Sequence, residues 1–347
     1  MARRPDSLEA LRRGGKAALA RALSAVETDA ADPGLDALLD AAWAQPRGRV
    51  LGLTGPPGVG KSTLTNALIR HYRDMGESVG VLAVDPSSQI TGGALLGDRT
   101  RLVTDPEDAG VFVRSMAARD RLGGLSDHAV AAIMLMRAAM DRVIVESVGV
   151  GQSEGDVAHV SDVLALCIQP GSGDSLQFMK AGVMELPDLI VVTKADMGGL
   201  ATRARADVAG AVSLARPPDA RALPEVIAVS ATSGEGIGDM MAACDALFER
   251  LERDGGLAAA RARQARHHVA DTIRVRFGRV GAGLVDADAA LAREGGPFSA
   301  VAALDRDLRA RLGLQADKMM EGRGAGSPVA RRRSAAGTSD GGTGRQR

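Results

Sequence analysis

The segment GPPGVGKS at residues 55–62 decides the fold of this chain. It directly follows the apolar run VLGLT (50–54) and precedes the helical pattern TLTNALIRHYRDM (63–75). The spacing G-x-x-x-x-G-K-[ST], set between a strand and a helix, is that of a P-loop, in which backbone N–H groups and the helix N-terminus bind phosphate. The sequence therefore predicts a binding site for a nucleoside triphosphate.

Two side chains of this loop have predicted chemical tasks. Lys61 is expected to bridge the β- and γ-phosphates, and the Ser62 hydroxyl is expected to bind magnesium. A chance Gly-rich turn would not require Lys and Ser at these positions between a strand and a helix. The other predicted phosphate contacts are Gly55, Gly58, Val59, Gly60 and Thr63.

Short runs of β-branched and apolar residues recur downstream of the loop, separated by helical segments. This alternation is typical of an α/β fold with a mostly parallel, doubly wound sheet covered on both faces, as in P-loop NTPases. Together with VLGLT, the predicted strands are residues 79–84, 111–115, 142–147, 163–168, 189–193 and 226–230.

Helical patterns rich in Ala, Leu and Arg flank the predicted sheet on both sides. They predict an N-terminal helical extension over residues 1–45, a P-loop domain over 46–237 and a C-terminal helical extension over 238–321. Residues 322–347 contain few apolar side chains, so burial cannot offset the entropy of ordering them. We expect this segment to be a disordered tail.

Composition narrows the class of partner. Among 347 residues, 43 Lys and Arg balance 43 Asp and Glu, so no net charge points to nucleic acid or to an anionic membrane. No apolar run approaches the ~20 residues that span a bilayer, and the first residues lack the apolar stretch of a signal peptide. We expect a cytoplasmic protein without nucleic-acid or membrane partners, with Cys167 and Cys244 as core thiols.

Two later loops predict which base is bound. The segments VVTKADM (191–197) and VSATSGEGI (229–237) each follow a strand and resemble the guanine-specificity loops of GTPases. The Asp196 carboxylate can accept hydrogen bonds from guanine N1–H and the 2-amino group, a donor pair that adenine lacks. Lys194 is expected along the base plane, and the Ala231 N–H at guanine O6. The predicted base-loop residues are Thr193, Lys194, Asp196, Ser230, Ala231 and Thr232. Most GTPases carry Asn at the position of Thr193.

Four segments around these loops resemble one particular family. They are AVDPSSQITGGALLGDRTRL (83–102), RSMAARDRLGGL (114–125), VESVGVGQSE (145–154) and GSGDSLQFMKAGVMELPD (171–188). Nearly the whole chain resembles the G-protein chaperones associated with methylmalonyl-CoA mutase, also labelled arginine/lysine/ornithine transport ATPases.

The resemblance implies a magnesium-dependent GTPase that binds GTP and GDP and forms a homodimer through its helical extensions. Its implied partner is a cobalamin-dependent acyl-CoA mutase, and hydrolysis would gate adenosylcobalamin loading, protection or repair on that enzyme.

Carboxylates at strand ends are the predicted magnesium ligands besides Ser62. Asp85 and Glu146 each end a predicted strand, where ligands sit in open α/β sheets, and carboxylate oxygens suit magnesium directly or through its waters. The resemblance implies that residues 148–154 form switch II and that the loop holding Asp98 forms switch I, with Asp98 completing the metal site on activation. The structural alternatives are a helix-capping Asp98 and a buried, paired Glu146.

A third loop, GDSLQFMK, carries the last candidate catalytic residue. Lys180 matches the catalytic-loop lysine of the family and could stabilise transition-state charge, although a solvated surface lysine is the alternative. Ser175 and Phe178 depart from the family pattern, which usually has an acidic residue and a Gly there. The predicted catalytic set is Lys61, Asp98, Glu146 and Lys180.

Three other functions share parts of this pattern. Nickel-insertion GTPases have the same fold, but they usually carry His- or Cys-rich metal segments that this sequence lacks. Lys194 and Asp196 argue against a transporter-associated ATPase, and a nonhydrolysing nucleotide-binding module remains as a third alternative. His267 and His268 are adjacent on a predicted helix and should point to different faces, which argues against a joint metal site. Trp43 is expected to be a packing residue.

Overall fold

The computed structural model describes residues 3–28, 32–85, 102, 104–117, 125–147, 153–171, 186–215 and 223–314. Met1–Arg306 forms one compact unit, and Asp307–Arg347 forms a second, of which residues 307–314 are described. Within the described ranges, no helix has the length and apolar character needed to cross a bilayer.

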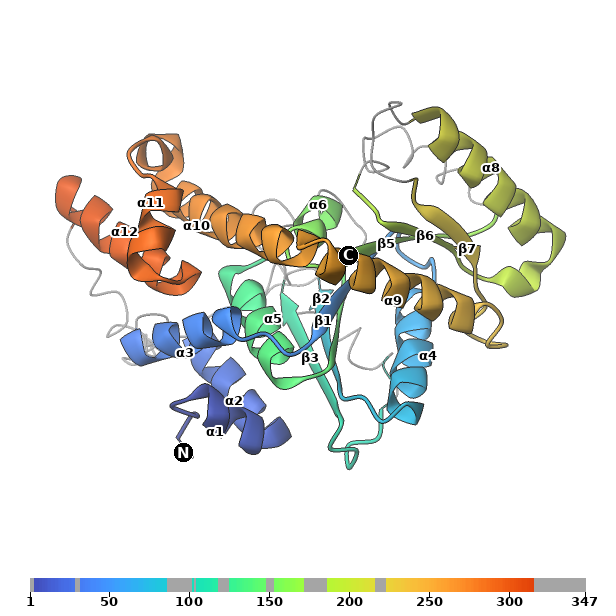
Figure 1. Ribbon diagram of the computed structural model, residues 1–347, viewed down its shortest axis with the longest axis horizontal. Coiled ribbons are helices and arrows are strands. Elements are labelled where there is room, and N and C mark those ends of the chain that lie inside the picture. Colours follow the sequence, from blue (N-terminus) through green and yellow to red (C-terminus); the bar gives the residue numbers. More distant parts are fainter. Residues whose placement is uncertain are drawn as a thin grey trace, which may run out of the picture. The chain divides into compact units, whose positions relative to one another are not determined.

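The first unit is built on a parallel sheet, as the sequence predicts (Figure 1). Its strands are β1 (Arg49–Thr54), β2 (Val79–Asp85), β3 (Val111–Ala117), β4 (Arg142–Glu146), β5 (Val163–Ile168), β6 (Leu189–Val192) and β7 (Glu225–Ala228). They lie in the order β3-β2-β4-β1-β5-β6-β7, and each neighbouring pair is parallel. Strands β2 to β4 lie on one side of β1, and strands β5 to β7 lie on its other side. Ligands of open α/β sheets bind at the carboxyl ends of the strands where the strand order reverses in this way.

Helices cover both faces of the sheet, which explains why the strands are continuous apolar runs rather than alternating ones. On one face, α4 (Lys61–Asp74) and α9 (Ile237–Arg253) share a core with the inward side chains of β1, β4 and β5. On the other face lie α5 (Asp127–Ala139), α6 (Ser153–Ala158) and α8 (Gly199–Ala215).

Three N-terminal helices form an additional layer over α5. They are α1 (Leu8–Arg13), α2 (Gly15–Thr28) and α3 (Pro33–Ala44). Their Leu and Ala side chains join the core on that face, and α5 is buried between them and the sheet. The N-terminal extension is therefore continuous with the core of the first unit.

The C-terminal helices are α10 (Gly256–Gly283), α11 (Ala287–Glu294) and α12 (Pro297–Arg311). Helix α10 is attached to the sheet by Arg261, whose Nη2 donates to the buried Asp162 carboxylate at 2.6 Å, and by Gln264, whose Nε2 donates to Ser161 O at 2.8 Å.

The predicted domain boundary at 45/46 falls between α3 and β1, and the predicted boundary at 237/238 falls at the start of α9. Both boundaries stay predictions, and the expected tail over residues 322–347 lies outside the described residues.

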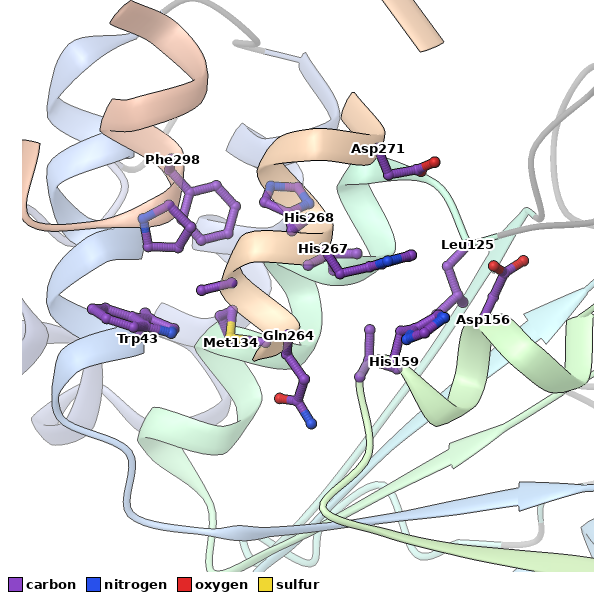
Figure 2. A pocket seen from close by; sticks show the side chains of 14 residues that line it. Trp43, Leu125, Met134, Asp156, His159, Gln264, His267, His268, Asp271 and Phe298 are labelled. Carbon is purple, nitrogen blue, oxygen red and sulfur yellow. The ribbon is translucent and has the colours of Figure 1, made fainter. Parts of the chain in front are cut away.

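A small cavity lies where α10 passes α5 and the end of α6 (Figure 2). The ring of His267 stacks on His159 with 3.7 Å between centroids, whereas His268 faces Phe298 at 5.1 Å, which confirms that the two adjacent histidines point to different faces. Trp43 packs against the core here, as predicted. The cavity holds about 40 Å³, room for a few waters but not for a nucleotide. The described His, Cys, Asp and Glu side chains form no group of three or more that could hold a metal ion.

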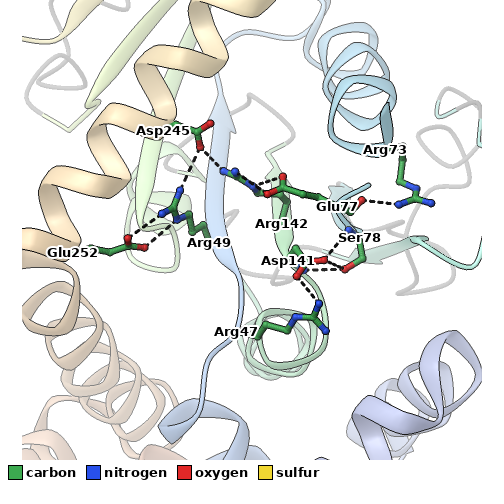
Figure 3. A network of polar contacts seen from close by, with 9 residues as sticks. All are labelled: Arg47, Arg49, Arg73, Glu77, Ser78, Asp141, Arg142, Asp245 and Glu252. Atoms are coloured by element: carbon green, nitrogen blue, oxygen red, sulfur yellow. Dashed lines mark hydrogen bonds and ion pairs between the residues drawn. The ribbon is translucent and has the colours of Figure 1, made fainter. Parts of the chain in front are cut away.

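An ion-pair network lies at the amino edge of the sheet, opposite the P-loop (Figure 3). Arg49 and Arg142 begin the paired strands β1 and β4, and both contact the Asp245 carboxylate of α9. Arg49 also pairs with Glu252, and Arg142 with Glu77 at 2.7 Å. Although burial disfavours its charge, hydrogen bonds to Glu77 and Asp245 raise the pKa of Arg142. The network attaches α9 to the ends of β1 and β4 at which these strands begin.

Candidate nucleotide-binding site

The P-loop connects β1 to α4 and has a backbone that requires glycine. Gly55, Gly58 and Gly60 have φ values of 135°, 73° and 105°, a region that side chains disfavour. A Cβ at Gly55 would also lie 2.1 Å from Cys167 O. These conformations let the loop curve around the position of a phosphate and enter α4 at its N-terminus. Beneath the loop, burial raises the pKa of the Cys167 thiol to about 12, so this cysteine is a neutral core thiol.

Lys61 is the first residue of α4 and lies against the loop. Its Nζ donates to Gly55 O at 2.7 Å and to Pro56 O at 3.0 Å, and the side chain is buried. The ammonium group is therefore held against the backbone of the loop, and in a P-loop the lysine ammonium and the backbone N–H groups donate together to the phosphates.

Ser62 and Glu146, predicted separately as magnesium ligands, lie together in the structure. The Ser62 Oγ donates to Glu146 Oε1 at 2.7 Å, although the two residues are 84 positions apart. Pairing of β1 with β4 places Glu146 beside Leu53, one residue before β1 ends. Thr65 Oγ1 donates to the second carboxylate oxygen of Glu146 at 3.1 Å. The group offers hydroxyl and carboxylate oxygens, which are the ligand types that magnesium prefers.

The other predicted ligands and catalytic residues are only partly described. Asp85 ends β2, and the pairing of Ala83 with Glu146 places the Asp85 backbone at the same carboxyl edge of the sheet. Asp98 and Lys180 lie outside the described residues, as do Ser175 and Phe178.

The first base loop is joined to the P-loop. Thr193 Oγ1 lies 2.7 Å from Val59 O and 3.1 Å from Ile168 O, so its single proton can be donated to either carbonyl. Thr at this position therefore still makes a supporting bond to the P-loop. Lys194 has a left-handed backbone with φ 57°, and its Nζ donates to Gln169 Oε1 at 2.6 Å and to Gly58 O at 3.4 Å.

Asp196 and the second base loop complete the predicted base site. Asp196 is exposed in the short 3₁₀ helix Ala195–Met197, and Ala195 N donates to Val229 O at 3.0 Å, which joins the two loops. The buried Ser230 Oγ accepts from Ser233 N at 3.2 Å and closes the second loop. Ala231 is half-buried and Thr232 exposed.

Two polar residues at this site were not predicted from the sequence. Thr65 is three positions after Ser62, so the helical period places both hydroxyls on one face of α4. The spacing of Ser62 and Thr65 could therefore have indicated from the sequence that both hydroxyls face the same site. Gln169 follows β5, and its contact with Lys194 arises from the pairing of β5 with β6, which no local pattern predicts.

Comparison with known proteins agrees with this geometry. The sequence model of a family described as "Methylmalonyl Co-A mutase-associated GTPase MeaB" matches residues 19–279. A relative from Pyrococcus abyssi, named "Putative GTPase", is 38% identical over 284 residues, which cover 81% of this chain and 86% of that protein. The mitochondrial methylmalonic aciduria type A homolog of Mus musculus is 40% identical over 223 residues, covering 63% of this chain and 53% of that protein.

Among solved structures, the crystal structure of LAO/AO transport system kinase aligns with a TM-score of 0.64 and 28% sequence identity. The alignment covers 87% of this chain and 96% of that one. The P-loop fold, the names of the relatives and the match over residues 19–279 identify a GTPase that binds GTP and GDP. The chain belongs to the family of methylmalonyl-CoA mutase-associated GTPases.

Proposed function

We propose that this GTPase gates adenosylcobalamin loading, protection or repair on a cobalamin-dependent acyl-CoA mutase in the cytoplasm. The observation that carries the proposal is the family match over residues 19–279, which includes the P-loop, both base loops and most of α10. The Mus musculus relative, named for methylmalonic aciduria, supports a connection with mutase chemistry.

In the proposed site, the P-loop backbone and Lys61 bind the β- and γ-phosphates, and Asp196 reads the guanine base. Ser62 and Glu146 lie 2.7 Å apart and would hold Mg²⁺ directly or through its waters, together with Asp85 and Asp98. When bound, Mg²⁺ neutralises charge on the β- and γ-phosphates. Lys180 would add positive charge at the transition state once the mutase has positioned it.

The decisive experiment measures GTP turnover with and without each acyl-CoA mutase of the same organism. If nucleotide state is coupled to the mutase, the mutase must change the relative affinities for GTP and GDP, because linkage is reciprocal. We expect at least ~10-fold stimulation, the gain from positioning one charge at the transition state, and Lys180→Ala should lose most of it while binding nucleotide normally. If no mutase alters turnover or affinity, the chaperone role is wrong while the GTPase assignment stands.

We also propose that the protein is a homodimer joined through its helical extensions. In support, apolar side chains are exposed on both sides of a kink at Gly278, where the backbone of α10 departs from helical geometry: Val275 is 58% exposed, Val280 is 72% exposed, and Leu284, which caps the helix, is 48% exposed. Exposed apolar side chains that gather in one region mark candidate interaction sites. Val280→Asp should shift the molar mass in light scattering toward the monomer. Leu214→Asp on α8, where the side chain is 89% exposed, is the matched control and should leave the mass unchanged. A monomeric wild type at micromolar concentration would contradict the proposal.

A further inference from the structure

The carboxylate of Glu146 is held at both oxygens by hydroxyl groups of one helix. Ser62 Oγ donates to Oε1 at 2.7 Å, and Thr65 Oγ1 donates to Oε2 at 3.1 Å. Glu146 and Thr65 are buried, Thr65 completely, whereas Ser62 is half-buried on the loop side. The two hydroxyls therefore differ in environment: one lies at the nucleotide site and the other in the core.

A glutamate side chain held at a single oxygen can still turn about its last torsion, because that torsion is broad and roughly two-fold. A second hydrogen bond, made to the other oxygen by a fully buried group, fixes the plane of the carboxylate. In this chain Thr65 supplies that second bond from α4, whose first residue is Lys61. The helix that carries the phosphate-binding lysine thus also sets the angle at which Glu146 faces Ser62.

We propose that Thr65 is a positioning residue for GTP hydrolysis, which acts by holding the Glu146 carboxylate so that Oε1 faces Ser62 and the magnesium site. The inference rests on the proposed magnesium role of Ser62 and Glu146. Thr65 touches neither nucleotide nor metal in this scheme, so its effect passes through Glu146. The alternative is that Thr65 only satisfies a buried polar group, as hydroxyls inside helices commonly do with a nearby carbonyl.

The test compares Thr65→Val, which keeps the shape but removes the hydroxyl, with Thr65→Ser, which keeps the hydroxyl. Readouts are kcat and KM for GTP, the magnesium concentration that half-saturates turnover, and magnesium-dependent slowing of fluorescent GDP release. We expect Thr65→Val to lower kcat about 10-fold and to raise the half-saturating magnesium concentration several-fold, because orientation of a metal-binding carboxylate by an outer hydrogen bond typically matters to that degree. GDP affinity in EDTA should stay unchanged, and Thr65→Ser should restore magnesium dependence.

The chain contains a matched control. Thr272 on α10 is also buried in a helix, and its Oγ1 donates to a carboxylate oxygen of Asp127 at 3.2 Å, away from the P-loop. Thr272→Val should lower the melting temperature about as much as Thr65→Val but leave kcat and magnesium dependence at wild-type values. If Thr65→Val folds too poorly to assay, Thr65→Ala is measured in its place.

Glu146→Gln separates failure of this inference from failure of the proposed magnesium site. If Glu146→Gln changes magnesium dependence while Thr65→Val only lowers stability, like Thr272→Val, then Thr65 is merely structural and the inference is wrong. If Glu146→Gln itself leaves magnesium dependence unchanged, the proposed metal site is wrong. A raised half-saturating magnesium concentration in both Glu146→Gln and Thr65→Val, with return to the wild-type value in Thr65→Ser, supports both the metal site and the inference.

Discussion

Exchanging the carboxylate of Asp196 for an amide should change which base the protein prefers. Asp196 is exposed at the end of the base loop, beside Lys194, and is free to meet a base from solvent. Its two oxygens can accept from guanine N1–H and the 2-amino group. In Asp196→Asn the amide N–H₂ instead faces the 2-amino group, and it matches the 2-oxo group of xanthine.

In Asp196→Asn the bond to the 2-amino group is lost, whereas the bond from N1–H is kept by the amide oxygen but no longer involves a charge. A hydrogen bond to a charged group is typically worth about 1.5–3 kcal/mol and a neutral one about 0.5–1.5 kcal/mol, and the exposure of Asp196 favours the lower values because water competes for the carboxylate. Losing one bond (about 1.5 kcal/mol) and weakening the other (about 1 kcal/mol) corresponds to a rise in Kd for GDP of roughly 70-fold. Affinity for XDP should rise at the same time, so the preference should invert.

The assay is displacement of a fluorescent GDP analogue by GDP, XDP and ADP, for wild type and Asp196→Asn. The matched control is Asp207→Asn, because Asp207 is also exposed but lies on α8. The control should retain wild-type preference. Wild-type discrimination between GDP and XDP in Asp196→Asn would show that Asp196 does not read the base.

Three further predictions concern the P-loop, the junction of the loops and acid stability. Lys61→Ala should abolish hydrolysis and weaken GTP binding in single-turnover and calorimetric assays, since its Nζ is held at the loop 2.7 Å from Gly55 O; near-normal turnover would contradict the assignment. Thr193→Val should raise the Kd for GTP about 10-fold by removing the bond to Val59 O, and Thr193→Asn should restore binding; equal affinities in all three proteins would refute this role. Burial, together with the nearby Asp40 and Asp32, raises the pKa of Asp36 from 3.8 to about 6. The folded protein therefore loses stability as the pH rises from about 3.8 to about 6, and this loss is complete above pH 6 and absent below pH 3.8. Asp36→Asn should therefore increase stability by roughly 1 kcal/mol near pH 7.5, a value discounted for solvent exposure, and by nothing near pH 3.5; a melting-temperature gain of equal size at both pH values would contradict it.

Much of the fold could be predicted because its signals are local. The strands are buried on both faces, so each appears as an apolar run, and the predicted strands agree with β1 to β7 within one or two residues. The P-loop needs left-handed backbone at Gly58 and Gly60, a requirement that the sequence displays directly. Helical periodicity predicted α10 but not its partners, because an amphipathic face does not specify what covers it.

By itself, the sequence determined the residue types of the site: a lysine and a serine after the glycines, a glutamate at a strand end, and two base loops. Tertiary structure alone decided that Ser62 and Glu146 lie 2.7 Å apart, that Thr65 takes the second oxygen of Glu146, and that Thr193 reaches Val59. These contacts join residues 81 to 134 positions apart. Their distances depend on which strands pair, in what register, and on the rotation of α4 against the sheet. Local propensity carries none of that information, because side chains distant in the chain meet only once the core has packed.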